Sequence, residues 1–394
     1  MSNLMWYPGH EVLLDDIVRG ENCTLFDSSG SRYVDLESGV WCTAIGHSHP
    51  AVLDALGEQW ARLAHTGFSF GSRVVEDAAR EVLDLLGMQG GRCVFLCSGG
   101  EAVEYGVRVA HMVVSRPLLM ILADSYCGAY GSARRKDPNE WHVFDWRPCE
   151  RCGRPAASCE SCELWGGVPW ERIGGFLLEP GSSGGLVRFP PNALVAAIAR
   201  RLEETDGLLL VNEVTTGVGR TGKWFGFEHY GVRPDVVALG KGIGNGYPVS
   251  VAALGPRVVG RLGDRPVPYS QSHQNDAAGA AVVRAVLRTI REGGLVERAR
   301  EMGELLRRGL DGVAARTGMV REVRSRGLMV AVELLGDEAG TLATRVHREL
   351  AGRGFVVARR PGTGVLRLDP ALTVEREDLE RFVATLEAVL EAER

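Results

Sequence analysis

The stretch Asp235-Val-Val-Ala-Leu-Gly-Lys-Gly-Ile-Gly-Asn-Gly246 places one lysine directly after a short apolar run. The run predicts a buried strand, and the glycines after Lys241 let a bulky group lie against the backbone. Upstream, residues 208–222 read as a second buried strand that ends in polar residues and continues into a turn-rich loop. A lone lysine after a strand is ordinarily a solvated loop charge. Polar residues at one strand end and a lysine at the next are instead typical of an aldehyde-binding site in an α/β sheet.

The composition is that of an ordinary globular protein, with 394 residues, 45% of them hydrophobic and 24% charged. This length predicts about two to three domains. A formal net charge of −5 provides no basic surface, so we expect no nucleic-acid partner. Residues 1–10 lack a basic segment followed by an apolar run, and no apolar stretch is long enough to cross a bilayer. We therefore expect no signal peptide, no membrane partner and a cytoplasmic location, where the nine cysteines stay reduced unless they hold a metal.

Strand and helix patterns alternate over most of the chain, which predicts an α/β fold: a mainly parallel sheet with helices on both faces. From residue 277 onward the pattern changes to long helices and a few short strands, typical of a smaller α+β domain. We predict an N-terminal segment (residues 1–50) that packs with the small domain, a large domain (51–276) and a C-terminal small domain (277–394). The expected strands are residues 92–96, 118–123, 173–178, 208–211, 236–239, 328–334 and 365–368, and the main expected helices are residues 51–64, 101–114 and 375–391.

A second motif lies between the first of these strands and the helix that follows it. The sequence Cys97-Ser-Gly-Gly-Glu-Ala102 directs free backbone N–H groups and a helix dipole toward one point, so Ser98, Gly99 and Gly100 form a candidate phosphate site. The glycines allow a phosphate to approach the main chain. By itself this motif is more often only a turn. Its significance comes from Lys241, which follows in the expected order.

Together these motifs resemble the signature of the class III aminotransferases, which bind pyridoxal 5′-phosphate (PLP) as a Schiff base on a lysine. The resemblance extends over nearly the whole chain, because five further segments match the family. It implies the PLP-dependent fold type I and a homodimer whose sites are shared between subunits. The five segments are Gly30-Ser-Arg-Tyr-Val-Asp-Leu36, Gly46-His-Ser-His-Pro50, Asp124-Ser-Tyr-Cys-Gly128, Glu179-Pro-Gly-Ser-Ser-Gly-Gly185 and Leu366-Arg-Leu-Asp-Pro370.

The resemblance also implies roles for individual residues. Lys241 would hold the cofactor and then act as general base and acid. Tyr126 would cover the cofactor ring, with Cys127 in a place where the family often has histidine. Trp41 and Arg367 would bind substrate, the arginine through a substrate carboxylate. The implied cofactor-binding residues are Ser98, Gly99, Gly100, Tyr126, Glu179, Asn212, Val214, Thr215 and Lys241, joined by Gln271 or Ser272 from the neighbouring subunit.

Two residues depart from the family pattern. The family has aspartate at the position of Asn212, where an ion pair keeps the pyridine nitrogen protonated and the ring a strong electron sink. Asparagine can form a hydrogen bond there but brings no charge. Thr215 stands where many members place glutamine against the ring's phenolic oxygen. These changes leave two hypotheses open: an ordinary transaminase with some loss of rate, or retuned cofactor chemistry.

The cysteines form a pattern that is not a general feature of the family. Cys149-Glu-Arg-Cys152 and Cys159-Glu-Ser-Cys162 are two Cys-x-x-Cys pairs with the spacing of a tetrahedral Cys₄ zinc site. An iron–sulfur cluster could use the same four ligands, and two disulfides are a third alternative that a reducing location disfavours. We predict a structural Zn²⁺ site in this insert, residues 149–162, because four thiolates leave no open position for catalysis.

The sequence thus predicts PLP-dependent transamination between a small-molecule amine and a keto substrate. Within PLP chemistry, a lyase, decarboxylase, epimerase or aminomutase is the alternative that Asn212 keeps open. A non-catalytic, zinc-stabilised binding protein with this fold is an alternative of another class, which the intact lysine and phosphate loop disfavour. Residues 179–185 contain no second acid, so the glutamate gate of ornithine-type members is not expected. His47 and His49 are expected to fix their loop rather than to transfer protons.

Overall fold

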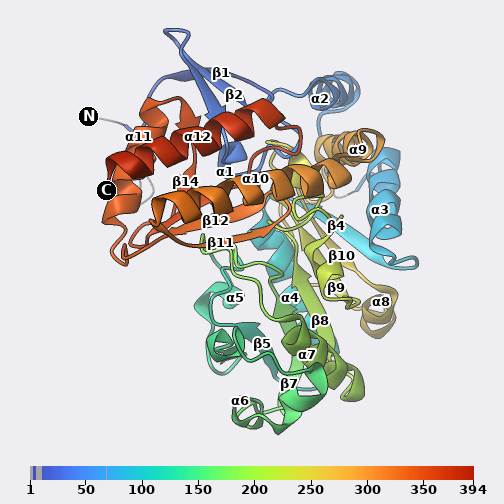
Figure 1. The fold of residues 1–394 in the computed structure, drawn as a ribbon. Coiled ribbons are helices and arrows are strands. Elements are labelled where there is room, and N and C mark those ends of the chain that lie inside the picture. Colours follow the sequence, from blue (N-terminus) through green and yellow to red (C-terminus); the bar gives the residue numbers. More distant parts are fainter. Residues whose placement is uncertain (1–2, 6–10, 68) are drawn as a thin grey trace.

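A computed structural model describes residues 3–5, 11–67 and 69–394. Its centre is a seven-stranded sheet in the order β4-β10-β9-β8-β7-β5-β6 (Figure 1). β10 runs antiparallel to both of its neighbours, and the remaining neighbours are parallel, so the predicted mainly parallel sheet is confirmed. The strands are β4 (Arg92–Leu96), β5 (Leu118–Leu122), β6 (Trp141–Phe144), β7 (Ile173–Leu178), β8 (Leu208–Asn212), β9 (Val236–Leu239) and β10 (Ser250–Leu254).

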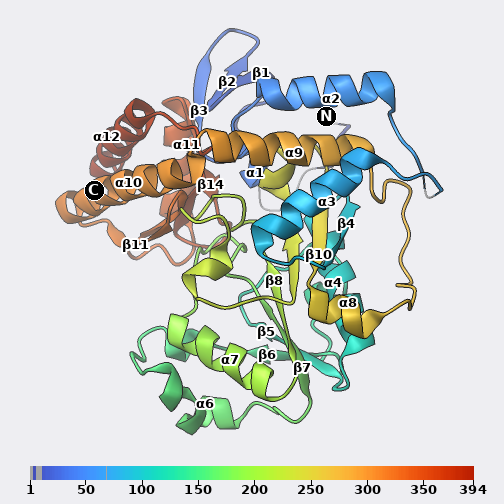
Figure 2. The same cartoon turned by 90° about the vertical axis from the view of Figure 1, so that its right-hand side faces the viewer.

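The central sheet is apolar on both faces because helices cover both. In β8, Leu208 and Leu210 belong to one core cluster, whereas Leu209 and Val211 belong to the other. Successive side chains of a strand point to opposite faces, so a strand buried on both sides must be apolar throughout. The covering helices are α4 (Gly99–Val113) and α8 (Pro256–Leu262) on one face, and α3 (Arg73–Leu86) and α7 (Asn192–Glu204) on the other (Figure 2).

The change of pattern at residue 277 coincides with the start of α9 (Ala277–Glu292), which packs against α3 and α2 (Pro50–Arg62). α10 (Leu295–Thr317) follows and lies beside α12 (Arg376–Ala392). An antiparallel sheet in the order β11-β12-β15-β14 packs with these helices. The remaining elements of this part are β11 (Val320–Arg326), β12 (Met329–Leu334), α11 (Thr341–Gly352), β14 (Ala358–Arg359) and β15 (Val365–Leu368).

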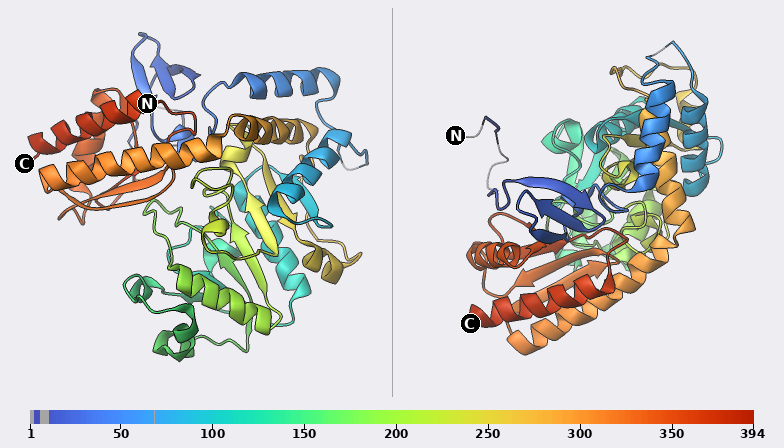
Figure 3. Two further views of the ribbon diagram at one scale, coloured as in Figure 1. Left: turned by 45° about the vertical axis from the view of Figure 1, so that its right-hand side comes forward. Right: turned by 90° about the horizontal axis from the view of Figure 1, so that it is seen from above.

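The N-terminal segment forms a third sheet with a strand from far along the chain. β1, β2 and β3 are joined in antiparallel order, and β3 pairs in parallel with β13. The two segments therefore lie side by side, with the blue strands against the red helices in Figure 3. These strands are β1 (Ile17–Glu21), β2 (Thr24–Asp27), β3 (Arg32–Asp35) and β13 (Phe355–Val356).

Two histidines hold the loop that leads into α2. The Nε2 atom of His47 lies 2.7 Å from Asp35 Oδ2. His49 is the N-cap of α2, where its Nδ1 accepts a hydrogen bond from the Ala51 N–H at 3.3 Å. Both side chains are thus engaged in fixing the backbone, as expected from the sequence.

Short elements occupy the remaining connections. No helix among the described residues is long and apolar enough to cross a membrane. The short helices are α1 (Ser38–Trp41), α5 (Ser132–Arg135) and α6 (Glu163–Gly166), and the 3₁₀ turns are η1 (Arg147–Cys149), η2 (Ala156–Ser161), η3 (Gly226–His229) and η4 (Lys241–Gly244).

Candidate active site

Lys241 begins the 3₁₀ turn η4, two residues after the end of β9. Its φ of 48° is a left-handed conformation, which a residue other than glycine adopts only where its surroundings enforce it. Burial lowers the pKa of the Lys241 ammonium from its ordinary value, and the nearby Arg367 guanidinium acts in the same direction. A lowered pKa leaves more of the amine neutral, and the neutral amine is the form that attacks an aldehyde.

The predicted phosphate site lies at the N-terminus of α4. Ser98 is the N-cap: its Oγ accepts a hydrogen bond from the Glu101 N–H at 3.3 Å, and Glu101 Oε2 accepts one from the Ser98 N–H at 2.7 Å. A Cβ on Gly99 would stand 2.5 Å from Val214 Cγ1, so only glycine fits there. A Cβ on Gly240 would stand 3.1 Å from the Gly99 Cα. The candidate phosphate loop and the lysine turn therefore lie directly against each other.

Glu179 follows β7 and is a buried carboxylate, with 2% of its surface exposed. Its oxygens accept hydrogen bonds from the Tyr126 N–H (3.1 Å) and from the N–H and Oγ of Ser183 (3.0 and 2.7 Å). The Nδ2 atom of Asn212 donates a further bond at 2.9 Å. These donors replace the water that a buried carboxylate loses. Glu179 thereby fixes the loop that carries Tyr126, whose side chain is half-buried.

Asn212 is the last residue of β8 and joins this network through its amide. A carboxylate can only accept hydrogen bonds, so the Asn212 NH₂ group faces Glu179. The amide oxygen accepts a bond from the Val214 N–H at 3.1 Å. An aspartate in this place would set two carboxylates against each other in a buried site. Thr215, the second departure from the family pattern, is also buried, in the turn after β8.

Glu213, the residue after Asn212, has a local structural role. It is buried and accepts hydrogen bonds from the Gly226 N–H (2.9 Å), the Phe227 N–H (2.8 Å) and Thr216 Oγ1 (2.6 Å). Burial raises the pKa of the Glu213 carboxyl to about 7. The residue therefore ties η3 to the turn that follows β8.

The structure brings Trp41 and Arg367 to Lys241. The Lys241 Nζ is 4.9 Å from the centroid of the Trp41 ring, and the Arg367 Cζ is 3.7 Å from the same centroid. Trp41 ends a left-handed turn, in which φ rises from 53° at Ser38 to 68° at Trp41. Consecutive left-handed residues are costly for side chains other than glycine, so surrounding contacts must enforce this turn.

Gln271 and Ser272 lie on the loop before α9. The Gln271 Nε2 is 3.5 Å from Cys97 Sγ, which places Gln271 beside the phosphate loop of its own chain. Ser272 is exposed. The expected contact of either residue with the phosphate of a neighbouring subunit involves a partner chain and stays a prediction.

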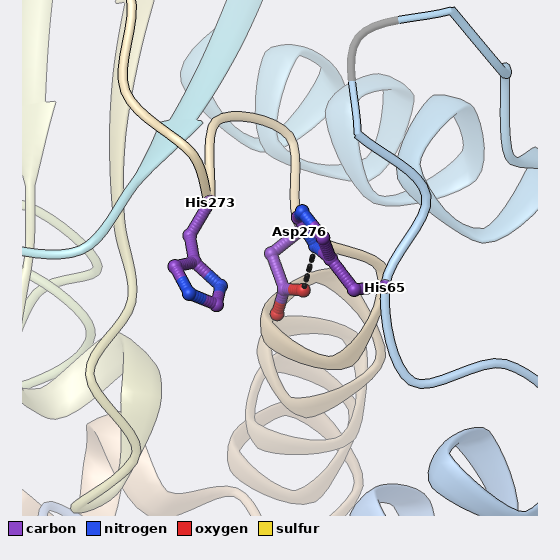
Figure 4. Close-up of side chains that lie close together, drawn as sticks. All are labelled: His65, His273 and Asp276. Carbon is purple, nitrogen blue, oxygen red and sulfur yellow. Dashed lines mark hydrogen bonds and ion pairs between the residues drawn. The ribbon is translucent and has the colours of Figure 1, made fainter.

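Further along this loop, His273 lies near His65 and Asp276 (Figure 4). The two imidazole centroids are 4.9 Å apart, and His65 Nδ1 is 3.4 Å from Asp276 Oδ1. Among the described residues, this is the one group of three such side chains whose ligand atoms lie within 4.8 Å of one another. Asp276 is already the N-cap of α9, with its Oδ2 accepting bonds from Gly279 N–H (2.8 Å) and Tyr247 OH (3.0 Å). We therefore assign Asp276 to anchoring α9.

The four cysteines of the insert line one cavity of about 320 Å³. Each Cys-x-x-Cys pair closes a turn: the Cys152 N–H donates to the Cys149 carbonyl at 3.1 Å, and the Cys162 N–H donates to the Cys159 carbonyl at 3.0 Å. Burial raises the pKa of the Cys149 thiol to about 11, and the three other thiols add to the rise. All four are free thiols, and no three of their sulfur atoms come within 4.8 Å of one another. The fold thus gathers the thiols around one space, and metal binding there stays a prediction.

Sequence reasoning missed several residues of the site. Ser250 Oγ donates to the Ser98 carbonyl at 2.7 Å, and the Tyr130 hydroxyl lies 3.4 Å from Ser98 Oγ. No local motif marks either residue. Asp369 forms an ion pair with Arg367, and here a signal was present. Residues two apart on a strand point to the same side, so an acid two positions after Arg367 could have been predicted to face it.

Comparison with known proteins identifies the family. The profile of the family described as Aminotransferase class-III matches residues 7–132 and 150–390. The acetylornithine aminotransferase of Streptomyces coelicolor is 30% identical over 378 residues, which cover 95% of this chain and 90% of that protein. The leucine/methionine racemase of Thermococcus litoralis is 28% identical over 402 residues, which cover 95% of this chain and 90% of that protein.

The solved structures add the fold. The amine transaminase from an uncultivated Pseudomonas species, in its PLP-bound form, superposes with a TM-score of 0.88 at 24% identity, over 100% of this chain and 99% of that one. The fold is therefore that of the PLP-dependent enzymes of fold type I. The chain belongs to the class III aminotransferase family. The family match is interrupted at residues 133–149, so it resumes between Cys149 and Cys152.

Proposed function

We propose that this enzyme transfers an amino group between a small primary amine and a carbonyl acceptor, with Lys241 binding PLP covalently. The observation that carries the proposal is a buried lysine amine of lowered pKa in a turn packed against the N-terminus of α4. An aldehyde needs such an amine, and a phosphate needs such a helix end. When bound, PLP supplies an electron sink for the bond that breaks at the substrate's amine carbon.

The residues of this chain would provide proton transfer, positioning of the cofactor and the shape of the substrate site. With PLP bound, Lys241 Nζ would take a proton from the substrate carbon as a base and deliver it again as an acid. Glu179 fixes the Tyr126 loop and orients the Asn212 amide. Asn212 would offer the cofactor ring a hydrogen bond but no charge. The Trp41 indole, 4.9 Å from Lys241 Nζ, limits the space beside the reacting amine.

The uncharged Asn212 amide favours a second candidate, an epimerase. A cofactor ring without a positive charge is a weaker electron sink. More of the negative charge that proton removal leaves would then stay on the substrate carbon. Delivery of a proton to the opposite face of that carbon, by a second acid, would invert it and give racemisation, whereas delivery of the proton by Lys241 Nζ to another atom would complete transamination. One relative at 28% identity carries the name leucine/methionine racemase. The two candidates therefore differ in the atom that receives the proton.

A half-reaction separates the candidates. The holoenzyme is mixed with enantiopure 1-phenylethylamine without an acceptor, and we expect loss of the cofactor's visible absorbance together with about one equivalent of ketone per chain. Racemised amine without ketone would instead favour the epimerase. Borohydride reduction followed by mass spectrometry then locates the covalent link.

The chain has three lysines, which provides matched controls for that link. Lys241→Ala should carry no pyridoxyl label. Lys136→Ala and Lys223→Ala should keep it, because those amines donate to the carbonyls of Ser125 (2.8 Å) and Glu228 (3.0 Å). Label that remains on the Lys241→Ala protein would refute the assignment.

For the four cysteines of the insert, we propose a structural Zn²⁺ ion. Its support is the chemistry of the donor set: four free thiols from two Cys-x-x-Cys turns around one cavity. Closing on an ion would draw the sulfur atoms together to the tetrahedral spacing of about 2.3 Å from the metal. Metal analysis of protein prepared without chelator should find about one zinc per chain. Iron with a visible charge-transfer spectrum would assign a cluster instead, and the absence of both metals would refute the proposal.

We further propose a cytoplasmic homodimer in which Gln271 or Ser272 reaches the partner's phosphate site. The nine free cysteines fit a reducing compartment. The proposed division into residues 1–50, 51–276 and 277–394 fits the three sheets, although β3 and β13 join the first part to the last. Sedimentation of the holoenzyme should give twice the chain mass, and a monomer with full activity would contradict the shared site.

A further inference from the structure

The guanidinium group of Arg367 is already neutralised within the protein. Its side chain is 1% exposed and forms a two-point ion pair with the fully buried Asp369. The Nε donates to Asp369 Oδ2 at 2.5 Å, and Nη2 donates to Oδ1 at 3.1 Å. The Nη1 donates to the Ser183 carbonyl at 3.2 Å. The face formed by Nε and Nη2, with which an arginine can bind a carboxylate at two points, is thus occupied by Asp369, and one N–H of Nη1 by Ser183.

Asp369 cannot easily turn away from this pair. It follows β15 directly, two residues after Arg367, so both side chains point to the same face of the extended chain. Its N–H donates to the Leu36 carbonyl at 2.7 Å, and its own carbonyl accepts a bond from Ser38 Oγ at 2.6 Å. The N-terminal segment therefore holds the Asp369 backbone from both sides.

The surroundings of the pair are rich in acidic groups. Burial raises the pKa of the Glu37 carboxyl to about 7, and the nearby Asp35 and Asp369 carboxylates contribute to the rise while Arg367 opposes it. Two carboxylates, Glu37 and Asp369, thus already lie near the Arg367 guanidinium, and the buried Arg220, whose Nη1 donates to the carbonyls of Leu328 and Pro370, is a second cation close to Asp369. A further carboxylate would have to enter this desolvated place against the acidic groups already there and without the face of Arg367 that Asp369 occupies, which is unfavourable.

One group beside Arg367 that remains available to a ligand is uncharged. The Trp41 ring lies against the guanidinium and also near the Lys241 amine. Its indole Nε1 is buried and has no hydrogen-bond partner among the described residues. Buried donors are normally paired, so this N–H is free for a ligand. The wall between Lys241 and Arg367 therefore offers an aromatic surface and one neutral donor.

We propose that Asp369 sets the substrate specificity of this enzyme: by occupying Arg367 it excludes substrates with a carboxylate in the space beside Trp41. The amino donor is then a primary amine whose substituents there are uncharged. This inference rests on the proposed function and names its substrate class. Specificity of this kind comes from an element that penalises the wrong ligand as well as from contacts that favour the right one.

The test compares matched amines in the half-reaction of the holoenzyme. 1-Phenylethylamine and 2-phenylglycine differ by a methyl group against a carboxylate next to the reacting carbon. Butylamine and 4-aminobutyrate differ by a carboxylate at the far end. We expect kcat/KM for the uncharged member of each pair to exceed that of its partner by about tenfold or more, since a buried charge left without a partner is strongly penalised. Preference for the carboxylate in either pair would overturn the proposal.

Two variants assign the effect to Asp369. Asp369→Asn removes the charge at nearly unchanged volume and should raise kcat/KM for the carboxylate donors by about tenfold. Asp311→Asn is the matched control, because Asp311 is an exposed acid paired with Arg307 and should change neither preference. If Asp369→Asn fails to fold, the apolar pair Arg367→Met with Asp369→Leu fills the same space without charges, and it should retain the preference for amines.

A binding measurement separates this inference from the proposed function. Calorimetric titration of the cofactor-free protein with phenylacetate should show no binding to the wild type and measurable binding to Asp369→Asn. If neither donor of either pair reacts, transamination is refuted, and this titration still decides the role of Asp369. Equal binding of phenylacetate by both proteins would show that Asp369 excludes nothing.

Discussion

Replacing Asn212 with aspartate would restore the residue usual in the family, but in this chain it would place a second carboxylate against Glu179. The atoms concerned are 2.9 Å apart and both residues are buried. Two unit charges at this separation repel each other by about 5–6 kcal/mol at an effective dielectric constant of about 20. Protonating an ordinary carboxyl at neutral pH costs less, about 4 kcal/mol, so the pair should bind a proton instead. We therefore expect Asn212→Asp to destabilise the cofactor-free protein by up to about 4 kcal/mol at neutral pH.

The pH dependence of this loss has a defined sign. The pair's pKa in the folded variant would lie above its value in the unfolded chain, so its stability is retained at low pH and lost as the pH rises. The deficit should shrink by about 1.4 kcal/mol for each pH unit on acidification, to about 1–1.5 kcal/mol near pH 5. Bound PLP should also reduce it, because a protonated ring nitrogen provides the missing positive charge.

Denaturant unfolding of wild type and variant at about pH 5 and about pH 8, with and without PLP, measures these effects. The control is Glu179→Gln with and without Asn212→Asp, because removal of the Glu179 charge should abolish the pH-dependent part. A deficit that is the same at both pH values, or that persists in the Glu179→Gln background, would refute the reasoning. If the restored aspartate also charges the ring, the half-reaction with the native amine should become faster, as the family pattern implies.

Three further outcomes follow from the geometry of the site. Gly99→Ala should destabilise the cofactor-free protein by about 1–3 kcal/mol, because its Cβ would stand 2.5 Å from a Val214 methyl, whereas Gly100→Ala has ordinary room and should be neutral in the same unfolding assay. Glu213→Gln should flatten the fall in stability as the pH rises through about 7, because a carboxyl with a raised folded-state pKa loses its contribution in that window; an unchanged pH profile would argue against its titration there. Cys149→Ser should remove the metal and lower the melting temperature while the cofactor's visible absorbance persists, and equal melting temperatures would contradict a structural ion.

The strands that position the site could be predicted from the sequence because they are buried on both faces. β7 and β9 are continuous apolar runs, and their predicted bounds agree with the structure. β10 was not predicted, since its core of two alanines carries little strand propensity and its antiparallel direction has no local signal. β1, with its exposed Arg19 and Glu21, was missed because only its pairing with β2 makes it a strand.

The sequence by itself determined the fold class and the positions of the lysine turn and of the candidate phosphate loop. Each of these depends on neighbours in the chain: apolar runs, glycines at a strand end and a serine that caps the next helix. Only the tertiary structure decided that Asn212 faces Glu179 and that Asp369 is held by the N-terminal segment at Leu36. These contacts join residues from distant parts of the chain. The energetic effect of a buried charge or amide depends on the partner that packing places within hydrogen-bond distance. For that reason the chain's family could be read from its motifs, whereas the charge that a substrate meets beside Trp41 could not.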